Sequence, residues 1–297
     1  TIGVLLKSMN HQHWMDVRSG IEDAAGNLGV ETIILYPADE SASEEQKAMF
    51  YDLVSAKPDA ILFAPCDSGN CAGLVQASEN DGIPVIAIDT RSEDISLPYI
   101  GANNYLIGRL AAQHMIQLTG GTGSIAVVSG VKTQASHTER LSGFKQELER
   151  HPGMTIATVK NADSDFRLAM QSMEKIISEY PDISGVFCTS AVMGLGVIEQ
   201  KKRGFYAADP YIVSVDTQDD ALSALKNGTL DGLVTQDGYE AGFKAVYEVV
   251  ALLEGEEIGE NTYIHTELLT RKNIDEFMDE RLSEKWGYNE KSIDRGR

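Results

Sequence analysis

Short apolar runs alternate with amphipathic helical stretches along nearly the whole chain, and this alternation limits the fold more than any other feature. A strand, a helix and a second strand in succession build a parallel sheet with helices on its faces. Strands buried on both faces carry continuous apolar runs, as these do. The predicted strands are residues 2–6, 32–36, 60–64, 85–88, 125–128, 186–188 and 212–215. The predicted helices are residues 14–28, 44–55, 106–118, 141–150, 168–179, 194–202 and 241–254.

The alternation continues over 297 residues, beyond the size at which a single hydrophobic core stops growing. We therefore predict an α/β fold of two doubly wound, Rossmann-like lobes with parallel sheets. Three extended segments, 99–104, 230–237 and 262–269, are expected to pass between the lobes as a three-stranded hinge. The predicted first lobe is residues 1–102 plus 237–265, and the second is 103–236 plus 266–297. The tail from residue 273 is predicted to be helical.

The composition is that of a soluble globular protein with an acidic surface. Apolar residues make up 42% and charged residues 24%, and no segment approaches the roughly 20 apolar residues that span a bilayer. The 45 acidic and 25 basic side chains give a net charge of −20, which repels nucleic acid, so we expect no nucleic-acid partner. The chain opens in a strand without a charged leader, so we expect either a cytosolic protein or one whose secretion signal has been removed.

The three cysteines, Cys66, Cys71 and Cys188, do not make a disulfide framework. Cys66 and Cys71 are close enough in sequence to form a local bridge. Free, partly buried thiols are the interpretation we favour.

The loop after the first predicted strand carries several polar and aromatic side chains. Lys7, His11, His13 and Trp14 place a cation, two imidazoles and an indole at one end of the sheet. An aromatic ring beside hydrogen-bonding groups suits a sugar, whose C–H faces stack on rings while its hydroxyls need partners. The alternative for Trp14 is packing of a helix against the sheet. A metal site at the histidine pair is not expected, because no acidic or thiol partner lies at metal-site spacing.

Two aspartates end predicted strands: Asp89 follows the strand at 85–88, and Asp216 follows the strand at 212–215. Open parallel sheets bind ligands outside the carboxyl ends of their strands, so both carboxylates are expected to face a pocket. Each carboxylate accepts several hydroxyl hydrogens, in charge-assisted bonds worth roughly 1.5–3 kcal/mol. The alternative for both is capping of a helix N-terminus.

Arg140 and Gln236 complete the polar set. Arg140 opens a predicted helix, and its planar guanidinium suits two oxygens of a diol or a bridge between both aspartates. A surface ion pair with Glu139 or a neighbouring residue is the alternative. Gln236 ends an extended segment and can both donate to a hydroxyl and accept from one.

The common enzyme motifs are mostly absent from the chain. Gly-x-Ser-x-Gly, the phosphate-binding Gly-x-x-x-x-Gly-Lys-Ser/Thr and a Gly-x-Gly-x-x-Gly after the first strand do not occur. His137 and Glu139 form half of a zinc-deaminase signature, but no Pro-Cys-x-x-Cys follows. We therefore expect no catalytic residues, no metal and no cofactor.

Five stretches together resemble the type I periplasmic solute-binding proteins of the ribose- and galactose-binding class, the substrate-binding components of sugar ABC transporters. They are Lys-Ser-Met-Asn-His-Gln-His-Trp at 7–14, Val-Ile-Ala-Ile-Asp-Thr-Arg at 85–91, Glu-Arg-Leu-Ser-Gly-Phe at 139–144, Val-Ser-Val-Asp-Thr at 213–217 and Leu-Lys-Asn-Gly-Thr-Leu-Asp-Gly-Leu-Val-Thr-Gln-Asp at 225–237. Their order and spacing match the family, and the resemblance extends from Thr1 to about Arg271.

This resemblance implies a two-lobed clamp that closes on a sugar. The family's ligand-binding positions correspond here to His11, His13, Trp14, Asp89, Arg140, Ser190, Asp216 and Gln236. Lys7 adds a further donor and a positive charge to the expected site. Ser190 replaces the usual asparagine, Ala64 stands at a position that is often asparagine, and Ser164 at one that is often aromatic, with Phe166 as a nearby substitute. A plain pentose, hexose or polyol is the leading ligand, and Lys7 with the two histidines leaves room for a sugar acid or a phosphorylated sugar.

The resemblance also implies partners and a location. The expected partner is an ABC transporter permease, the expected state is a monomer, and the expected place is periplasmic or extracellular, with a lipoprotein tether. The main alternative is the effector-binding part of a lac-repressor-type transcription regulator without its DNA-binding head. Two further alternatives are the sensing domain of a membrane receptor or kinase and an enzyme.

Overall fold

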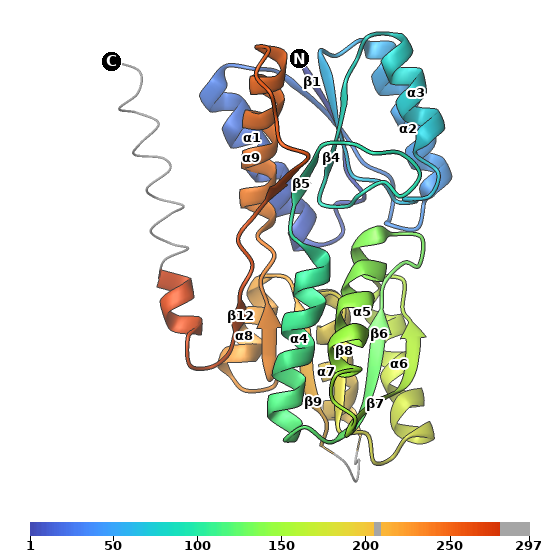
Figure 1. The fold of residues 1–297 in the computed structure, drawn as a ribbon, viewed down its shortest axis with the longest axis vertical. Coiled ribbons are helices and arrows are strands. Elements are labelled where there is room, and N and C mark those ends of the chain that lie inside the picture. Colours follow the sequence, from blue (N-terminus) through green and yellow to red (C-terminus); the bar gives the residue numbers. More distant parts are fainter. Residues whose placement is uncertain (205–208, 280–297) are drawn as a thin grey trace.

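The computed structural model describes residues 1–204 and 209–279, and this part of the chain forms two α/β lobes placed end to end (Figure 1). Each lobe has a six-stranded sheet with helices on both faces. The predicted fold class is therefore confirmed. Residues 280–297, which include the end of the predicted tail helix and of the predicted second lobe, lie outside the described residues. None of the helices in the described ranges combines the length and apolar character needed to cross a membrane.

The sheet of the first lobe is parallel, with strand order β11-β5-β4-β3-β1-β2. Its strands are β1 (Ile2–Leu5), β2 (Thr32–Leu35), β3 (Ala60–Phe63), β4 (Val85–Ile88), β5 (Tyr99–Gly101) and β11 (Asn261–Tyr263). One face packs on α1 (Gln12–Leu28) and α9 (Gly238–Leu253), and the other on α2 (Ser43–Ala56) and α3 (Ala72–Asn80). Strands β1, β3 and β4 are buried along their whole length, which explains their continuous apolar runs.

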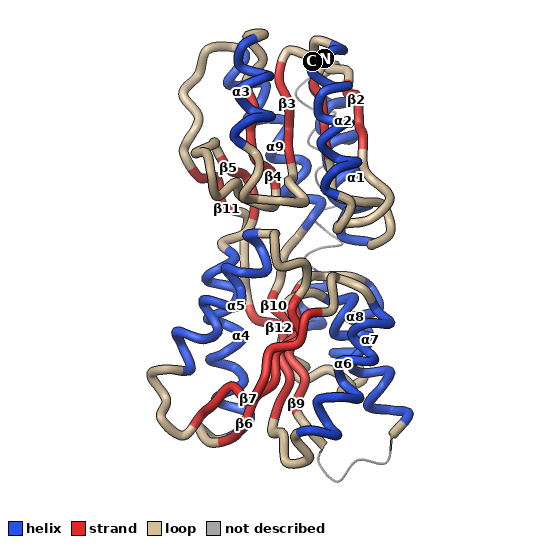
Figure 2. The backbone as a smooth tube through the Cα atoms, turned by 90° about the vertical axis from the view of Figure 1, so that its right-hand side faces the viewer, coloured by secondary structure: helices blue, strands red, loops and turns tan. Residues whose placement is uncertain are grey.

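The sheet of the second lobe has strand order β12-β10-β9-β8-β6-β7. Its strands are β6 (Gly123–Ser129), β7 (Met154–Asn161), β8 (Gly185–Cys188), β9 (Tyr211–Val215), β10 (Gly232–Val234) and β12 (Leu268–Leu269). Helices α4 (Asn104–Thr119) and α5 (Ala135–Leu148) cover one face, and α6 (Phe166–Glu179), α7 (Ala191–Arg203) and α8 (Asp219–Lys226) cover the other (Figure 2). Among the described strands, only β12 runs antiparallel to its neighbour, β10.

Within the residues that the structure describes, the chain passes between the lobes at three places: from β5 to α4, from β10 to α9, and from β11 to β12. The segment predicted as one run at 262–269 is divided, because β11 belongs to the first sheet and β12 to the second. The predicted strands also did not include β7, an edge strand whose residues are mostly half-buried or exposed. Its polar side chains interrupt the apolar run that marks a buried strand.

Glycines let two pairs of helices pack backbone against backbone. In the second lobe, a Cβ atom on Gly108 of α4 would overlap the carbonyl oxygen of Arg140 on α5, and one on Gly143 would overlap that of Tyr105. In the first lobe, Gly20 of α1 and Gly242 of α9 make the same kind of contact. The close contact between α4 and α5 fixes the backbone from which Arg140 extends.

Candidate functional site

A cavity lies between the lobes, and every site residue predicted from the sequence lines it. The predicted residues gathered there are Lys7, His11, His13, Trp14, Asp89, Arg140, Ser190, Asp216 and Gln236. The structure adds lining residues that were not predicted as site residues: Glu40, Ser136, His137, Ser164, Val192 and Gln218. Both groups come from loops and helix starts that follow the carboxyl ends of strands, where open parallel sheets form their pockets.

Asp89 and Asp216 occupy equivalent positions, directly after β4 in the first lobe and directly after β9 in the second. Both have left-handed backbone conformations, with φ of 65° and 79°, which residues other than glycine rarely adopt. Strain of this kind persists at functional sites because the surrounding contacts hold it. Asp216 also accepts a hydrogen bond from the backbone N–H of Ala191, the first residue of α7, at 3.1 Å. The helix-cap alternative therefore holds in part for Asp216, whereas Asp89 lies between two strands.

Asp89 is buried among donors and cations. It accepts hydrogen bonds from His13 Nε2 at 2.8 Å, from Thr90 Oγ1 at 2.9 Å and from Gln236 Nε2, and Lys7 Nζ lies 3.8 Å away. Burial works against its charged form, but His13 and Lys7 hold the pKa of Asp89 well below its usual range. Burial likewise disfavours charge on His13, yet the Asp89 carboxylate raises the pKa of His13 to about 9. At neutral pH this pair is ionised.

Arg140 is also buried, so the surface ion pair considered from the sequence does not form. Its Nε donates to Asn104 Oδ1 at 2.8 Å, its Nη1 to the carbonyl oxygen of Thr189 at 2.7 Å, and its Nη2 to Gln236 Oε1. Asp216 Oδ1 lies 4.0 Å from Nη1. The guanidinium is thereby fixed in one plane, with its edge in the cavity.

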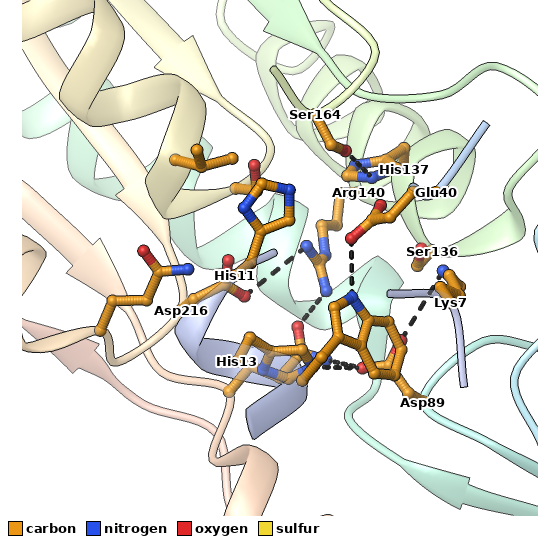
Figure 3. Close-up of a pocket in the computed structure, with 15 residues that line it drawn as sticks. Lys7, His11, His13, Glu40, Asp89, Ser136, His137, Arg140, Ser164 and Asp216 are labelled. Carbon is orange, nitrogen blue, oxygen red and sulfur yellow. Dashed lines mark hydrogen bonds and ion pairs between the residues drawn. The ribbon is translucent and has the colours of Figure 1, made fainter. Parts of the chain in front are cut away.

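Gln236 joins the two charged groups. Its amide oxygen accepts from Arg140 and its amide nitrogen donates to Asp89. The result is one continuous chain of contacts from the first lobe to the second, made of His13, Asp89, Gln236, Arg140 and Asp216. Figure 3 shows the two ends of this chain, His13 beside Asp89 and Arg140 beside Asp216. The predicted bridge between the aspartates therefore exists, but it runs through Gln236 as well as Arg140.

Trp14 is held in place from several sides. Its Nε1 donates to Glu40 Oε1 at 2.7 Å, Lys7 Nζ lies 5.4 Å from the ring centre, and the His13 ring meets it edge-on at 5.1 Å. The indole is only 2% exposed and packs in the core of the first lobe while also lining the cavity. Trp14 therefore both packs its helix against the sheet and lines the cavity, so the two interpretations made from the sequence hold together.

The second lobe lines the cavity with polar side chains. Ser164, at a position that is often aromatic in the family, is one of them. His137 contacts Thr189 Oγ1 at 2.9 Å through Nδ1 and Ser164 Oγ at 3.1 Å through Nε2. Burial and the nearby charge of Arg140 hold the pKa of His137 well below its usual range, so the imidazole is neutral. Ser190 Oγ is buried and has no hydrogen-bond partner among the described residues. Buried hydroxyls are normally paired, so this group is open to a ligand.

The lobes also touch beside the cavity. Lys7 Nζ donates to Gln134 Oε1 at 2.8 Å, and Gln134 Nε2 donates to the carbonyl oxygen of Glu40 at 3.0 Å. Nearby, Thr133 Oγ1 donates to the carbonyl oxygen of Cys66 at 3.1 Å. Gln134 is fully buried by these contacts. The structure therefore shows the lobes in a closed arrangement.

All three cysteines are free and buried, which confirms the interpretation favoured from the sequence. Burial raises the pKa of Cys66 and of Cys71 to about 12. The thiols are therefore protonated at neutral pH.

The arrangement is suited to holding a small polyhydroxylated molecule. Carboxylates accept hydroxyl hydrogens, the guanidinium and serines donate to hydroxyl oxygens, and an indole supplies an apolar surface. Two hinged lobes with a shared polar cavity at the carboxyl ends of their sheets define a two-lobed small-molecule-binding protein.

Comparison with known proteins gives the family. Residues 2–257 match the model of the periplasmic binding protein domain, and the chain belongs to this family. It is 26% identical over 273 residues to the ribose import binding protein RbsB of Bacillus subtilis, covering 92% of this chain and 88% of that protein. It is 25% identical over 248 residues to the D-allose-binding periplasmic protein of Escherichia coli, covering 80% of each. A carbohydrate transporter solute-binding protein from Agrobacterium radiobacter, solved with D-arabinose, superposes with a TM-score of 0.89 at 25% identity, covering 95% of this chain and 97% of that one.

Proposed function

We propose that this protein is an extracytoplasmic binding protein that closes on a monosaccharide or polyol and delivers it to an ABC permease. The observation that carries the proposal is the continuous chain from His13 to Asp216, which places hydroxyl-binding groups of both lobes around one cavity. The relatives named for ribose import and D-allose binding, and the neighbour solved with D-arabinose, support a sugar as the ligand.

Binding is coupled to closure because the hydrogen-bonding groups are divided between the lobes. In an open form only half of them face the ligand, so the ligand binds the closed form more tightly and shifts the population toward it. Closure also expels water from the cavity, which strengthens each bond between a carboxylate and a hydroxyl. The permease then recognises the outer surface of the closed form.

The side chains have distinct roles in this proposal. Asp89 and Asp216 accept hydroxyl hydrogens, Arg140 and Ser190 donate to ligand oxygens, and the part of the Trp14 ring that lines the cavity contacts a C–H face. Lys7 and His13 keep Asp89 ionised and oriented. Gln236 lies two residues after β10 and couples the two lobes through the chain segment that leads into α9.

The proposal includes a setting and a division of the chain. The protein acts as a monomer outside the cytoplasm, with a lipoprotein tether and no enzymatic turnover. The lobes divide as residues 1–102 plus 237–265 and residues 103–236 plus 266–297. The net charge of −20 disfavours the regulator alternative, because it opposes binding to DNA. A helix-turn-helix encoded directly upstream of Thr1 would overturn the transport assignment.

The direct test is a thermal-shift screen of the purified protein against pentoses, hexoses, polyols, sugar acids and sugar phosphates, followed by calorimetry. A ligand that binds only the folded state raises the melting temperature by mass action. We expect stabilisation by at least one sugar or polyol, with one ligand bound per chain. Absence of stabilisation by every compound, or release of a chemically altered sugar, would refute the proposed function.

A further inference from the structure

Glu40 differs from the other carboxylates that line the cavity. It lies in the loop between β2 and α2 and is only 8% exposed. Its Oε1 accepts the indole hydrogen of Trp14 at 2.7 Å, and Figure 3 shows the Glu40 carboxylate among the side chains that line the cavity. Within residues 1–204 and 209–279, no lysine, arginine or histidine nitrogen forms an ion pair with it. Glu40 is therefore a nearly buried carboxylate with one neutral donor.

The cations of the cavity already face other carboxylates. Lys7 and His13 lie against Asp89, and Arg140 lies nearest to Asp216. Lys7 also donates to Gln134 on the opposite lobe, and Arg140 donates to Gln236. Each of these three positive charges therefore already has a carboxylate neighbour and needs no anionic ligand to balance it.

A buried carboxylate is stable only when donors satisfy its oxygens, and its two oxygens accept up to about four hydrogen bonds. Trp14 supplies one of them. Glu40 lines the cavity, so O–H donors of a bound ligand are suited to fill the remaining capacity when water is expelled. A ligand carboxylate or phosphate supplies acceptors instead and adds a like charge in a poorly solvated space.

From these contacts we propose that Glu40 is a ligand-binding residue that accepts hydroxyl hydrogens from an uncharged sugar or polyol and excludes anionic sugars. This inference rests on the proposed function and narrows its ligand class. It decides against the sugar acids and phosphorylated sugars that Lys7 and the histidines leave open in the sequence. Selectivity then arises from a repulsive element as well as from attractive contacts.

The test compares matched ligands on the wild type and on Glu40→Gln. Calorimetry would measure the Kd of D-galactose, D-galacturonate and D-galactose 6-phosphate, and of D-ribose and D-ribose 5-phosphate. Of D-galactose and D-ribose, one should bind the wild type more tightly. The wild type should bind that sugar at least about tenfold more tightly than its anionic derivatives. Glu40→Gln should weaken the binding of the neutral sugar. It should also reduce the ratio of the Kd of the anionic derivative to the Kd of the neutral sugar by about tenfold.

Two controls separate a ligand contact from a structural role. Glutamine at position 40 keeps an acceptor for the Trp14 indole, so the fluorescence spectrum of the free variant should match that of the wild type. Glu44→Gln removes the same charge from an exposed position in the first turn of α2 and should leave the preference unchanged. A changed Trp14 spectrum together with an unchanged preference would assign Glu40 a purely structural role.

The outcomes distinguish this inference from the proposed function. Tighter binding of an anionic derivative than of its neutral parent by the wild type would overturn the role of Glu40 and leave a sugar-binding protein. An unchanged preference in Glu40→Gln would do the same. Failure of every ligand to bind the wild type would refute the proposed function and this inference with it.

Discussion

At the scale of single residues, the site is a set of buried charges that satisfy one another across the lobes. Asp89 and Asp216 have left-handed backbone conformations, and each is held by a hydrogen bond from its backbone N–H and by another to its carboxylate. Gln236 connects the first carboxylate to Arg140. Each group is both a candidate ligand contact and a part of the structure, so substitutions should affect binding and stability to different degrees.

Arg140→Ala should abolish ligand-induced stabilisation. The substitution removes donors to the ligand and leaves the Thr189 carbonyl and the Gln236 amide oxygen without their partner. Loss of several charge-assisted hydrogen bonds should raise the Kd by about 100-fold or more. Thermal-shift and calorimetric titrations check this, and circular dichroism should show an unchanged fold of the free protein. Normal ligand binding by this variant and by Asp89→Ala would mean that the pocket is misplaced.

Because of the ion pair between His13 and Asp89, the free energy of unfolding should decrease as the pH becomes alkaline. The pKa of His13 is raised from 6.5 to about 9, so its contribution is complete below 6.5 and is lost as the pH rises through about 9. We expect the free energy of unfolding of the wild type to fall over this range. His13→Gln should show a flatter dependence, because it has no proton to lose there.

Urea unfolding at several values between about pH 6 and pH 10 measures this difference. Parallel pH profiles of the wild type and His13→Gln would contradict an ionised His13–Asp89 pair.

At the scale of elements, glycine contacts between helices position the site. Gly108 of α4 lies against the backbone of Arg140, and Gly143 of α5 lies against Tyr105. The separation of the two helices therefore determines where the guanidinium lies relative to Asp216 and Gln236.

Gly108→Ala should force α4 and α5 apart, because the added methyl group would overlap the Arg140 carbonyl oxygen. Overpacking of this kind costs about 1–3 kcal/mol, and displacement of Arg140 should also weaken ligand binding. The matched control is Gly26→Ala in α1, where an added Cβ atom meets nothing within 4 Å. This substitution should stabilise the protein by about 0.5–1 kcal/mol, because alanine favours the helix over glycine. Chemical unfolding compares the two variants. Equal stability of the two variants would contradict the proposed backbone contact.

The sequence allowed much of this to be predicted, for identifiable physical reasons. Buried parallel strands such as β3 and β4 have continuous apolar runs, so their carboxyl ends and Asp89 could be located. Strand β7 lies at an edge and β12 has only two residues, so neither carries a clear periodic signal. Glu40 and Ser136 follow β2 and β6 at a distance in sequence, and only the spatial meeting of all the loops at one sheet edge brings them to the cavity.

At the scale of the whole molecule, the two lobes and the ligand are expected to act as one closing unit. The contacts of Gln134 with Lys7 and with the Glu40 backbone lie outside the three connecting segments and exist only when the lobes meet. They stabilise the closed form, and Lys7 links them directly to Asp89.

Gln134→Ala should therefore weaken the binding of every ligand by a similar factor. Loss of the two hydrogen bonds disfavours closure by an amount that does not depend on ligand identity, and we expect a rise in Kd of about 3- to 30-fold. Calorimetry with two or more sugars measures it. A loss confined to one sugar would assign Gln134 to ligand contact and not to closure.

The most direct test of the central claim is small-angle X-ray scattering of the protein with and without a saturating sugar found by the thermal-shift screen. If a sugar shared by the two lobes holds them closed, the radius of gyration should decrease when it is added, and Arg140→Ala should show no decrease. Saturated binding with identical scattering curves for the free and bound wild type would contradict closure on the ligand.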